Sequence, residues 1–127
     1  MKLWIDDIRP APKGYIWCRT VNEAKENIVK ANNLLNSALN SAKYHFINGN
    51  GFAVEEYLEE AKIHKIELID IDHDAGDYAY DGGDYIKLLD WLEETGRNYP
   101  IRIHSMNPVG RENMRVIIRK NGWTEVF

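Results

Sequence analysis

The sequence of 127 residues contains a single cysteine, Cys18, and lacks long apolar runs. One cysteine cannot form a disulfide within the chain or a cysteine-rich zinc site, and it is typical of a reducing compartment. No apolar run approaches the roughly 20 residues that a membrane-spanning helix needs. The first residues, MKLWIDD, pass directly into a predicted strand and acidic residues, so we expect no secretory signal. These absences predict a cytoplasmic protein.

The chain also has little positive charge. Its 16 lysines and arginines stand against 20 aspartates and glutamates, which gives a net charge of −4. We therefore expect no extended surface for nucleic acid, because such a surface contacts many phosphates. The charges are unevenly distributed: residues 70–84 contain six aspartates and no lysine or arginine, whereas residues 102–127 contain four arginines and one lysine against two glutamates. An acidic, metal-preferring region thus precedes a basic, phosphate-preferring one, although two solvated faces of opposite sign are an equally common origin.

Short apolar runs alternate with amphipathic segments along the whole chain. An apolar fraction of 44%, without repeats, low-complexity tracts or linkers, predicts one packed domain over residues 1–127. Strands are predicted at 3–5, 15–19, 66–72, 101–105 and 123–127, and helices from Thr20 past Leu35 and at 54–63, 86–95 and 113–120. This alternation predicts a doubly wound α/β protein, a flavodoxin-like three-layer sandwich whose parallel sheet has about five strands.

The segment 36–52 (NSALNSAKYHFINGNGF) fits this alternation least well. It contains the turn signal Asn48-Gly49-Asn50-Gly51. We interpret it as an insertion into the domain.

Carboxylates follow two of the predicted strands. Asp6 and Asp7 close the first strand, and Asp72 closes the central one. The carboxyl ends of parallel strands meet at one edge of a sheet, so we expect these side chains to gather there and to hold Mg²⁺ or Mn²⁺. The alternative is a solvated turn in which aspartates cap local amides. Asp70 faces the same side as Asp72; burial would require a partner such as an arginine, and the sequence assigns it no role.

Two histidines stand beside these strand ends. His73 follows Asp72 directly, and His104 precedes Ser105 at the end of the next strand. Because an unperturbed imidazole titrates near neutral pH, the pair suits general acid–base catalysis on a phosphoester. A lone histidine is more often a core or surface residue with satisfied hydrogen bonds.

Hydroxyl, amide and guanidinium groups complete the predicted site. Ser105 and Asn107 can donate hydrogen bonds to phosphate oxygens, and the helix that follows presents its N-terminus to an anion. Arg9 and Arg111 can bind a phosphate through two hydrogen bonds each. For each arginine the alternative is a surface ion pair, and for Arg111 the two interpretations are equal.

With these residues, the chain resembles the receiver domain of two-component signalling. Asp6 and Asp7 match the metal-binding acidic pair, Asp72 matches the phospho-acceptor, and Ser105 matches the hydroxyl residue after the fourth strand. The resemblance implies a magnesium-supported site in which Asp72 can take a phosphoryl group. Two features differ: no lysine matches the one that ends the receiver's fifth strand, and the loop RPAPKGY replaces its first helix.

The chain is more similar still to the cyclic-phosphate-processing receiver-like domains, a divergent branch of this superfamily. The similarity lies in the three stretches LWIDDIRPAP, IDIDHDAG and RIHSMNPVGRENM. It implies a role in handling the cyclic phosphates of nucleotides or of RNA ends.

These observations predict a metal-assisted enzyme, a cyclic phosphodiesterase or phosphotransferase, with a phosphorylated nucleotide or RNA end as substrate. The first alternative is a signalling receiver phosphorylated on Asp72, and the second is a pseudo-receiver that only binds a partner or nucleotide. The missing lysine counts against ordinary receiver signalling. His73 and His104 favour the enzyme, since a phospho-acceptor site does not need them.

Overall fold

A single parallel sheet organises the chain. The computed structural model describes residues 1–127 and has four strands in the order β2 (Tyr15–Cys18), β1 (Lys2–Ile5), β3 (Leu68–Ile71) and β4 (Ile101–Ile103). Ile5 is level with Cys18 on one side and with Ile71 on the other. This register brings the residues that follow β1 and β3 out side by side. The predicted α/β class with a parallel, flavodoxin-like sheet is confirmed.

Four α-helices and one 3-10 turn connect the strands. They are α1 (Val21–Ile47), α2 (Gly51–His64), the 3-10 turn η1 (Gly76–Tyr80), α3 (Ile86–Glu94) and α4 (Pro108–Asn121). Thr20 caps α1 as predicted, because its hydroxyl accepts the Glu23 amide at 3.0 Å. Helix α4 begins at Pro108 and not at the predicted Asn113, because Asn107 caps it by accepting the Gly110 amide at 3.0 Å.

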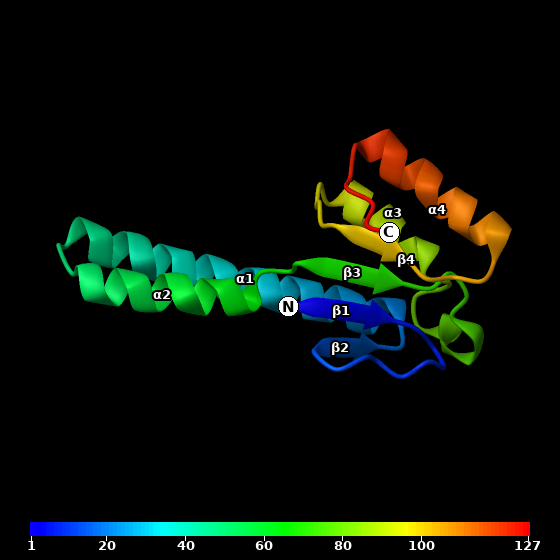
Figure 1. The fold of residues 1–127 in the computed structure, drawn as a ribbon, viewed down its shortest axis with the longest axis horizontal. Coiled ribbons are helices and arrows are strands. Elements are labelled where there is room, and N and C mark those ends of the chain that lie inside the picture. Colours follow the sequence, from blue (N-terminus) through cyan, green and yellow to red (C-terminus); the bar gives the residue numbers. More distant parts are fainter.

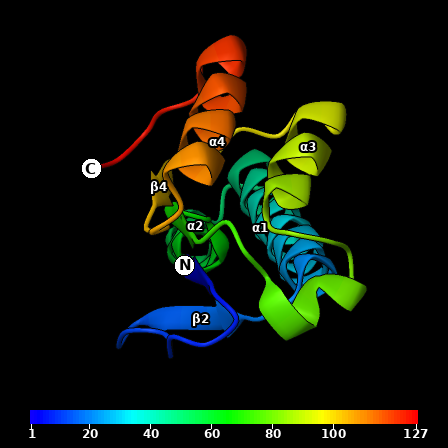
Figure 2. The same cartoon turned by 90° about the vertical axis from the view of Figure 1, so that its right-hand side faces the viewer.

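The helices cover only one face of the sheet. Figure 2 shows α1, α3 and α4 on the same side, and alternate strand residues on that side are buried, among them Leu3, Ile5, Ile69, Ile71 and Ile101. The opposite face carries half-buried or exposed side chains, among them Trp4, Tyr15, Trp17, Leu68 and Arg102, and Asp70 is its buried exception. The sheet is therefore part of a two-layer arrangement, in contrast to the predicted three-layer sandwich.

Two local features explain the missing layer. Residues 6–14 connect β1 to β2 without a helix, and the predicted strand at 123–127 is reduced to one parallel bridge between Glu125 and Ile101. The sheet thus has four strands and not about five. The connecting loop lies against the open face, where the indole N–H of Trp4 donates to the Arg9 carbonyl at 2.9 Å and that of Trp17 to the Asp6 carbonyl at 2.8 Å.

The far half of α1 and the whole of α2 form a hairpin that projects from the sheet (Figure 1). The segment 36–52 is the tip of this hairpin: it contains the end of α1, the turn at 48–50 and the start of α2. Its interpretation as an insertion stays a prediction. None of the helices is both long enough and apolar enough to cross a membrane.

Candidate functional site

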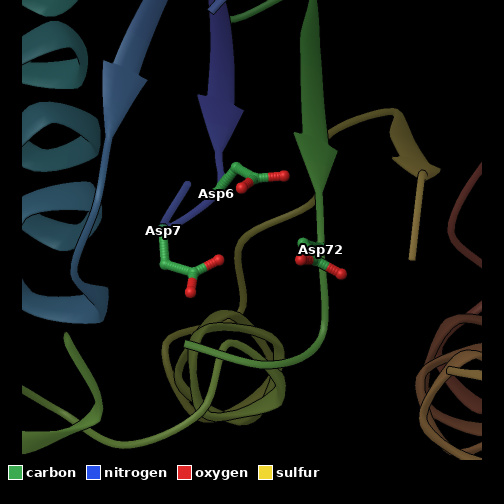
Figure 3. A group of neighbouring side chains, drawn as sticks. All are labelled: Asp6, Asp7 and Asp72. Atoms are coloured by element: carbon green, nitrogen blue, oxygen red, sulfur yellow. The ribbon is translucent and has the colours of Figure 1, made fainter. Parts of the chain in front are cut away.

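Three carboxylates meet at the carboxyl edge of the sheet (Figure 3). Asp6 and Asp7 follow β1, Asp72 follows β3, and one ligand oxygen of each lies within 4.8 Å of the others. Asp6 is buried, whereas Asp7 and Asp72 are half-buried and open to solvent. The level register of β1 and β3 produces this cluster, which is the one expected from the sequence.

Asp6 is the anchored member of the cluster. Its Oδ1 accepts the amides of Ile8 at 2.9 Å and Arg9 at 2.8 Å, and its Oδ2 lies 2.9 Å from His104 Nε2. Burial alone would raise the pKa of Asp6, but the two amides and the imidazole outweigh it and hold the pKa below its ordinary value. Asp6 is therefore a fixed negative charge in the site.

Asp7 experiences the opposite balance. Burial raises its pKa, and the negative charges of Asp6 and Asp72 raise it further. Gly76 lies directly against the carboxylate: a Cβ at this position, where φ is +53°, would lie 2.5 Å from Asp7 Oδ2. Mutually repelling oxygen ligands that remain accessible are the donor set of a hard divalent cation, so the residues present fit Mg²⁺ or Mn²⁺.

His104 is clamped between two carboxylates. Its Nδ1 lies 2.7 Å from Asp70 Oδ1, its Nε2 faces Asp6, and its ring stacks on Trp4 with centroids 3.9 Å apart. Arg102 completes the row, 3.7 Å from the second oxygen of Asp70. Sequence reasoning left Asp70 without a role and did not mention Trp4. The strand register reveals the connection between them, since Trp4, Asp70 and Arg102 are paired neighbours on three adjacent strands.

His73 belongs to a second group beside the cluster. Its Nδ1 lies 2.9 Å from Asp74 Oδ1, its Nε2 has no partner within the chain, and its amide donates to Asp72 Oδ1 at 2.8 Å. Asn107 donates to Asp74 Oδ2 at 3.3 Å through its side chain and to the Ser105 hydroxyl at 3.1 Å through its backbone. The hydrogen bond from His73 is the main reason that the pKa of Asp74 lies below its ordinary value.

Gly110, in the first turn of α4, determines where the His73 ring can lie. A Cβ at residue 110 would overlap the ring at Cγ, Cδ2 and Nδ1. Gly110→Ala is therefore expected to displace the imidazole from Asp74 and to change the nitrogen chemical shifts of His73 in long-range ¹H–¹⁵N spectra. Gly51→Ala, a helix position where a Cβ meets nothing within 4 Å, is the matched control. Identical His73 shifts in both variants would contradict this positioning role.

The other predicted phosphate-binding residues are distributed unevenly around these groups. Arg9 lies over the cluster, with Nε 4.0 Å from Asp6 Oδ2 and Nη1 donating to the His104 carbonyl at 3.4 Å. Ser105 is buried, and its hydroxyl accepts the Asn107 amide. The Arg111 side chain makes no hydrogen bond or ion pair with either group. It lines a hollow of about 350 Å³ with Met106, Pro108 and Arg115, and its buried Nε has no partner. The structure thus brings all these residues to one edge except Arg111, which faces this neighbouring hollow.

The parallel sheet, the acidic pair after β1 and the aspartate after the central strand define a receiver-like protein. The family of the cyclic-phosphate processing receiver domain matches residues 1–120, and the chain belongs to this family. The resemblance inferred from the three sequence stretches is thereby confirmed. Searches of curated proteins and of solved structures found no match.

Proposed function

We propose that the protein hydrolyses or transfers a cyclic phosphate ester, such as the 2′,3′-cyclic phosphate of a nucleotide or RNA end, with the help of Mg²⁺ or Mn²⁺. The family description supports a cyclic phosphate as the substrate class. The observation that carries the proposal is the pairing of an open carboxylate cluster with His73, whose Nε2 is free and whose Nδ1 is held by Asp74. A site that only accepts a phosphoryl group on an aspartate has no use for such a histidine.

Asp6, Asp7 and Asp72 would hold the cation. When bound, a divalent cation would neutralise negative charge on the phosphoryl oxygens. The His104 ring, held by Asp70 and Trp4, would keep Asp6 Oδ2 in a fixed position. Both nitrogens of His104 already face carboxylates, so we assign it a positioning role and assign proton transfer at the substrate to His73. This narrows the sequence-based hypothesis of two acid–base histidines.

His73 has the geometry of a general base. In the tautomer that donates Nδ1–H to Asp74, the ring would present the lone pair of Nε2. In hydrolysis, Nε2 would take a proton from the attacking water while the oxygen of that water bonds to phosphorus. The bond from phosphorus to one ribose oxygen would break, that oxygen would take a proton from solvent water, and Nε2 would release its own proton to solvent. The product would be a phosphomonoester.

The phosphate-binding roles stay proposals of different kinds. Arg9 is exposed and adjacent to the cluster, so it would contact the phosphate directly. Asn107 and Ser105 are engaged with α4 and Asp74, so they would mainly shape the pocket wall. Arg111 has no ion-pair partner and would bind a more distant part of the substrate, such as a neighbouring phosphate.

A phosphorylated receiver is the second candidate, because Asp72 is half-buried beside Asp6 and Asp7 at the end of a central strand. Acetyl phosphate and Mg²⁺ would then give an acid-labile adduct that Asp72→Asn lacks. The direct test of the enzyme is incubation with a panel of 2′,3′-cyclic nucleotides and Mg²⁺. We expect phosphomonoester products; an adduct on Asp72 without any product would replace the proposal with the receiver.

Binding of Mg²⁺ or Mn²⁺ at a hundred times the dissociation constant is expected to raise the melting temperature by about 10 °C. A ligand at a hundred times its dissociation constant adds about 2.7 kcal/mol, and each kcal/mol corresponds to about 4 °C in a domain of this size. Asp7→Asn and Asp72→Asn should abolish the shift, and a chelator should reverse it. Differential scanning calorimetry measures the effect, with Asp77→Asn as the control on an exposed carboxylate outside the cluster. A shift that survives in both cluster variants would locate the metal elsewhere.

A further inference from the structure

The projecting hairpin leaves much of its apolar surface uncovered. We call residues 34–64 the arm (Figure 1). Its only buried side chains are three alanines, Ala38, Ala42 and Ala61. The large apolar residues of the arm that are exposed are Leu34, Leu39, Tyr44, Phe46, Ile47, Phe52, Leu58 and Ile63. Two helices joined through alanines cannot bury these side chains, so the arm has the composition of half a helix bundle.

A groove runs along one side of the arm. Leu35 and Leu39 of α1 and Leu58 and Ala61 of α2 form its apolar floor, with Lys62 and Lys65 at its base, and its volume is about 450 Å³. A further hollow of about 690 Å³ continues it to Ile66, Tyr99 and Pro100, just before β3 and β4. The groove therefore approaches the amino edge of the sheet, opposite the edge that carries Asp6, Asp7 and Asp72.

Charge along α2 indicates what fits this groove. Residues 55, 58, 62 and 65 form one helical stripe, which reads Glu55, Leu58, Lys62, Lys65 from the tip of the arm to its base. Ion pairs within the arm are Lys62–Glu59 and His64–Glu60, so Glu55 and Lys65 have no partner in the chain. The stripe is thus negative toward the tip, apolar in the middle and positive at the base. Two copies of the stripe that run in opposite directions therefore place opposite charges against each other.

We propose that the groove binds the arm of a second copy of this chain, packed antiparallel about a two-fold axis near Leu39 and Leu58. Reversal places Glu55 opposite the partner's Lys62 and Lys65, and the symmetry repeats the same contact on the other side. The leucines of both copies close over the groove, so that the two hairpins form a four-helix bundle. The two carboxylate sites stay open at the far ends of the dimer, so this inference is independent of the proposed chemistry.

Sedimentation equilibrium of the full chain tests the proposal. The expected mass is twice the 14.8 kDa of one chain at micromolar concentration. Like charges face each other across the axis in either of two variants, Glu55→Lys or the double variant Lys62→Glu, Lys65→Glu. Each variant should raise the dissociation constant of the dimer by about tenfold or more. An equal mixture of the two variants has opposite charges at every contact and should restore the dimer mass.

Val116→Lys, on exposed α4 away from the arm, is the matched control and should leave the dimer unchanged. Circular dichroism checks that each variant keeps its helix content, so that loss of the dimer is not loss of the arm. A wild-type chain that remains monomeric at about 100 μM, far above the Kd of a specific dimer, would overturn the proposal. The groove would then be a site for a different protein. A dimer whose dissociation constant is unchanged in both charge variants would contradict the antiparallel arrangement.

Discussion

Replacing His73 with alanine is expected to lower the turnover of a 2′,3′-cyclic nucleotide by about a hundredfold or more, the usual effect of losing a general base. The reason is that Nε2 of His73 has no partner within the chain, while Asp74 holds Nδ1 at 2.9 Å. Metal binding should survive the change, because His73 contributes no oxygen to the carboxylate cluster. Steady-state kinetics should therefore show a fall in kcat, with the metal-induced rise in melting temperature preserved.

His104→Ala should give the reverse pattern. Removal of the ring releases Asp6 Oδ2 and leaves Asp70 without its partner at 2.7 Å. The metal-induced rise in melting temperature should therefore become smaller. His64→Ala, at the end of α2, is the control for loss of a histidine outside the site. Turnover that persists in His73→Ala at the wild-type level would retire the acid–base assignment, whichever substrate is used.

Replacing Asp70 with alanine is expected to reduce the free energy of unfolding by about 3 kcal/mol or more. Asp70 is fully buried and contacts the side chains of His104 and Arg102, so its removal leaves polar groups without their partner inside the protein. Urea denaturation with an unchanged m-value measures the loss. The variant should also bind metal more weakly, because the His104 ring that holds Asp6 would be free to turn.

Asp74→Ala is the matched control, since this carboxylate also bonds a histidine at 2.9 Å but its side chain is 59% exposed. Exposed pairs contribute about 1 kcal/mol or less, so this variant should stay close to the wild-type stability. Its effect has a pH dependence of known sign: the pKa of Asp74 is lowered by folding, so its contribution is present above the unfolded pKa and disappears as pH falls through the folded one. Equal losses in the two variants would contradict the burial argument.

The sequence by itself determined the positions of β1 to β4 and the acidic edge of the sheet. Each strand is a short apolar run, so its position follows from local pattern. Once the strands are parallel and in register, Asp6, Asp7 and Asp72 must emerge at one edge. The family could also be inferred, because its similarity lies in contiguous stretches around these carboxylates.

The length of α1 was decided by tertiary packing. Residues 36–47 are rich in asparagine and serine, whose helix propensity is low, and the sequence pattern therefore indicated an insertion. In the structure Ala38 and Ala42 are buried in the seam with α2, and this contact extends the helix to Ile47. The open face of the sheet could not be predicted from the sequence for a related reason. Alternation of strands and helices does not say on which side each helix packs.

The partner of Asp70 was also decided by the tertiary structure. A buried carboxylate must be paired, and that requirement can be read from the strand LIDI around it. The identity of the partner cannot, because His104 lies 34 residues further along the chain. The register of β3 against β4 brings the two together, and the remaining nitrogen of His104 then faces Asp6, 98 residues away in sequence. Local pattern thus places the carboxylates at the edge, whereas long-range strand pairing decides which of them is anchored and which histidine stays free.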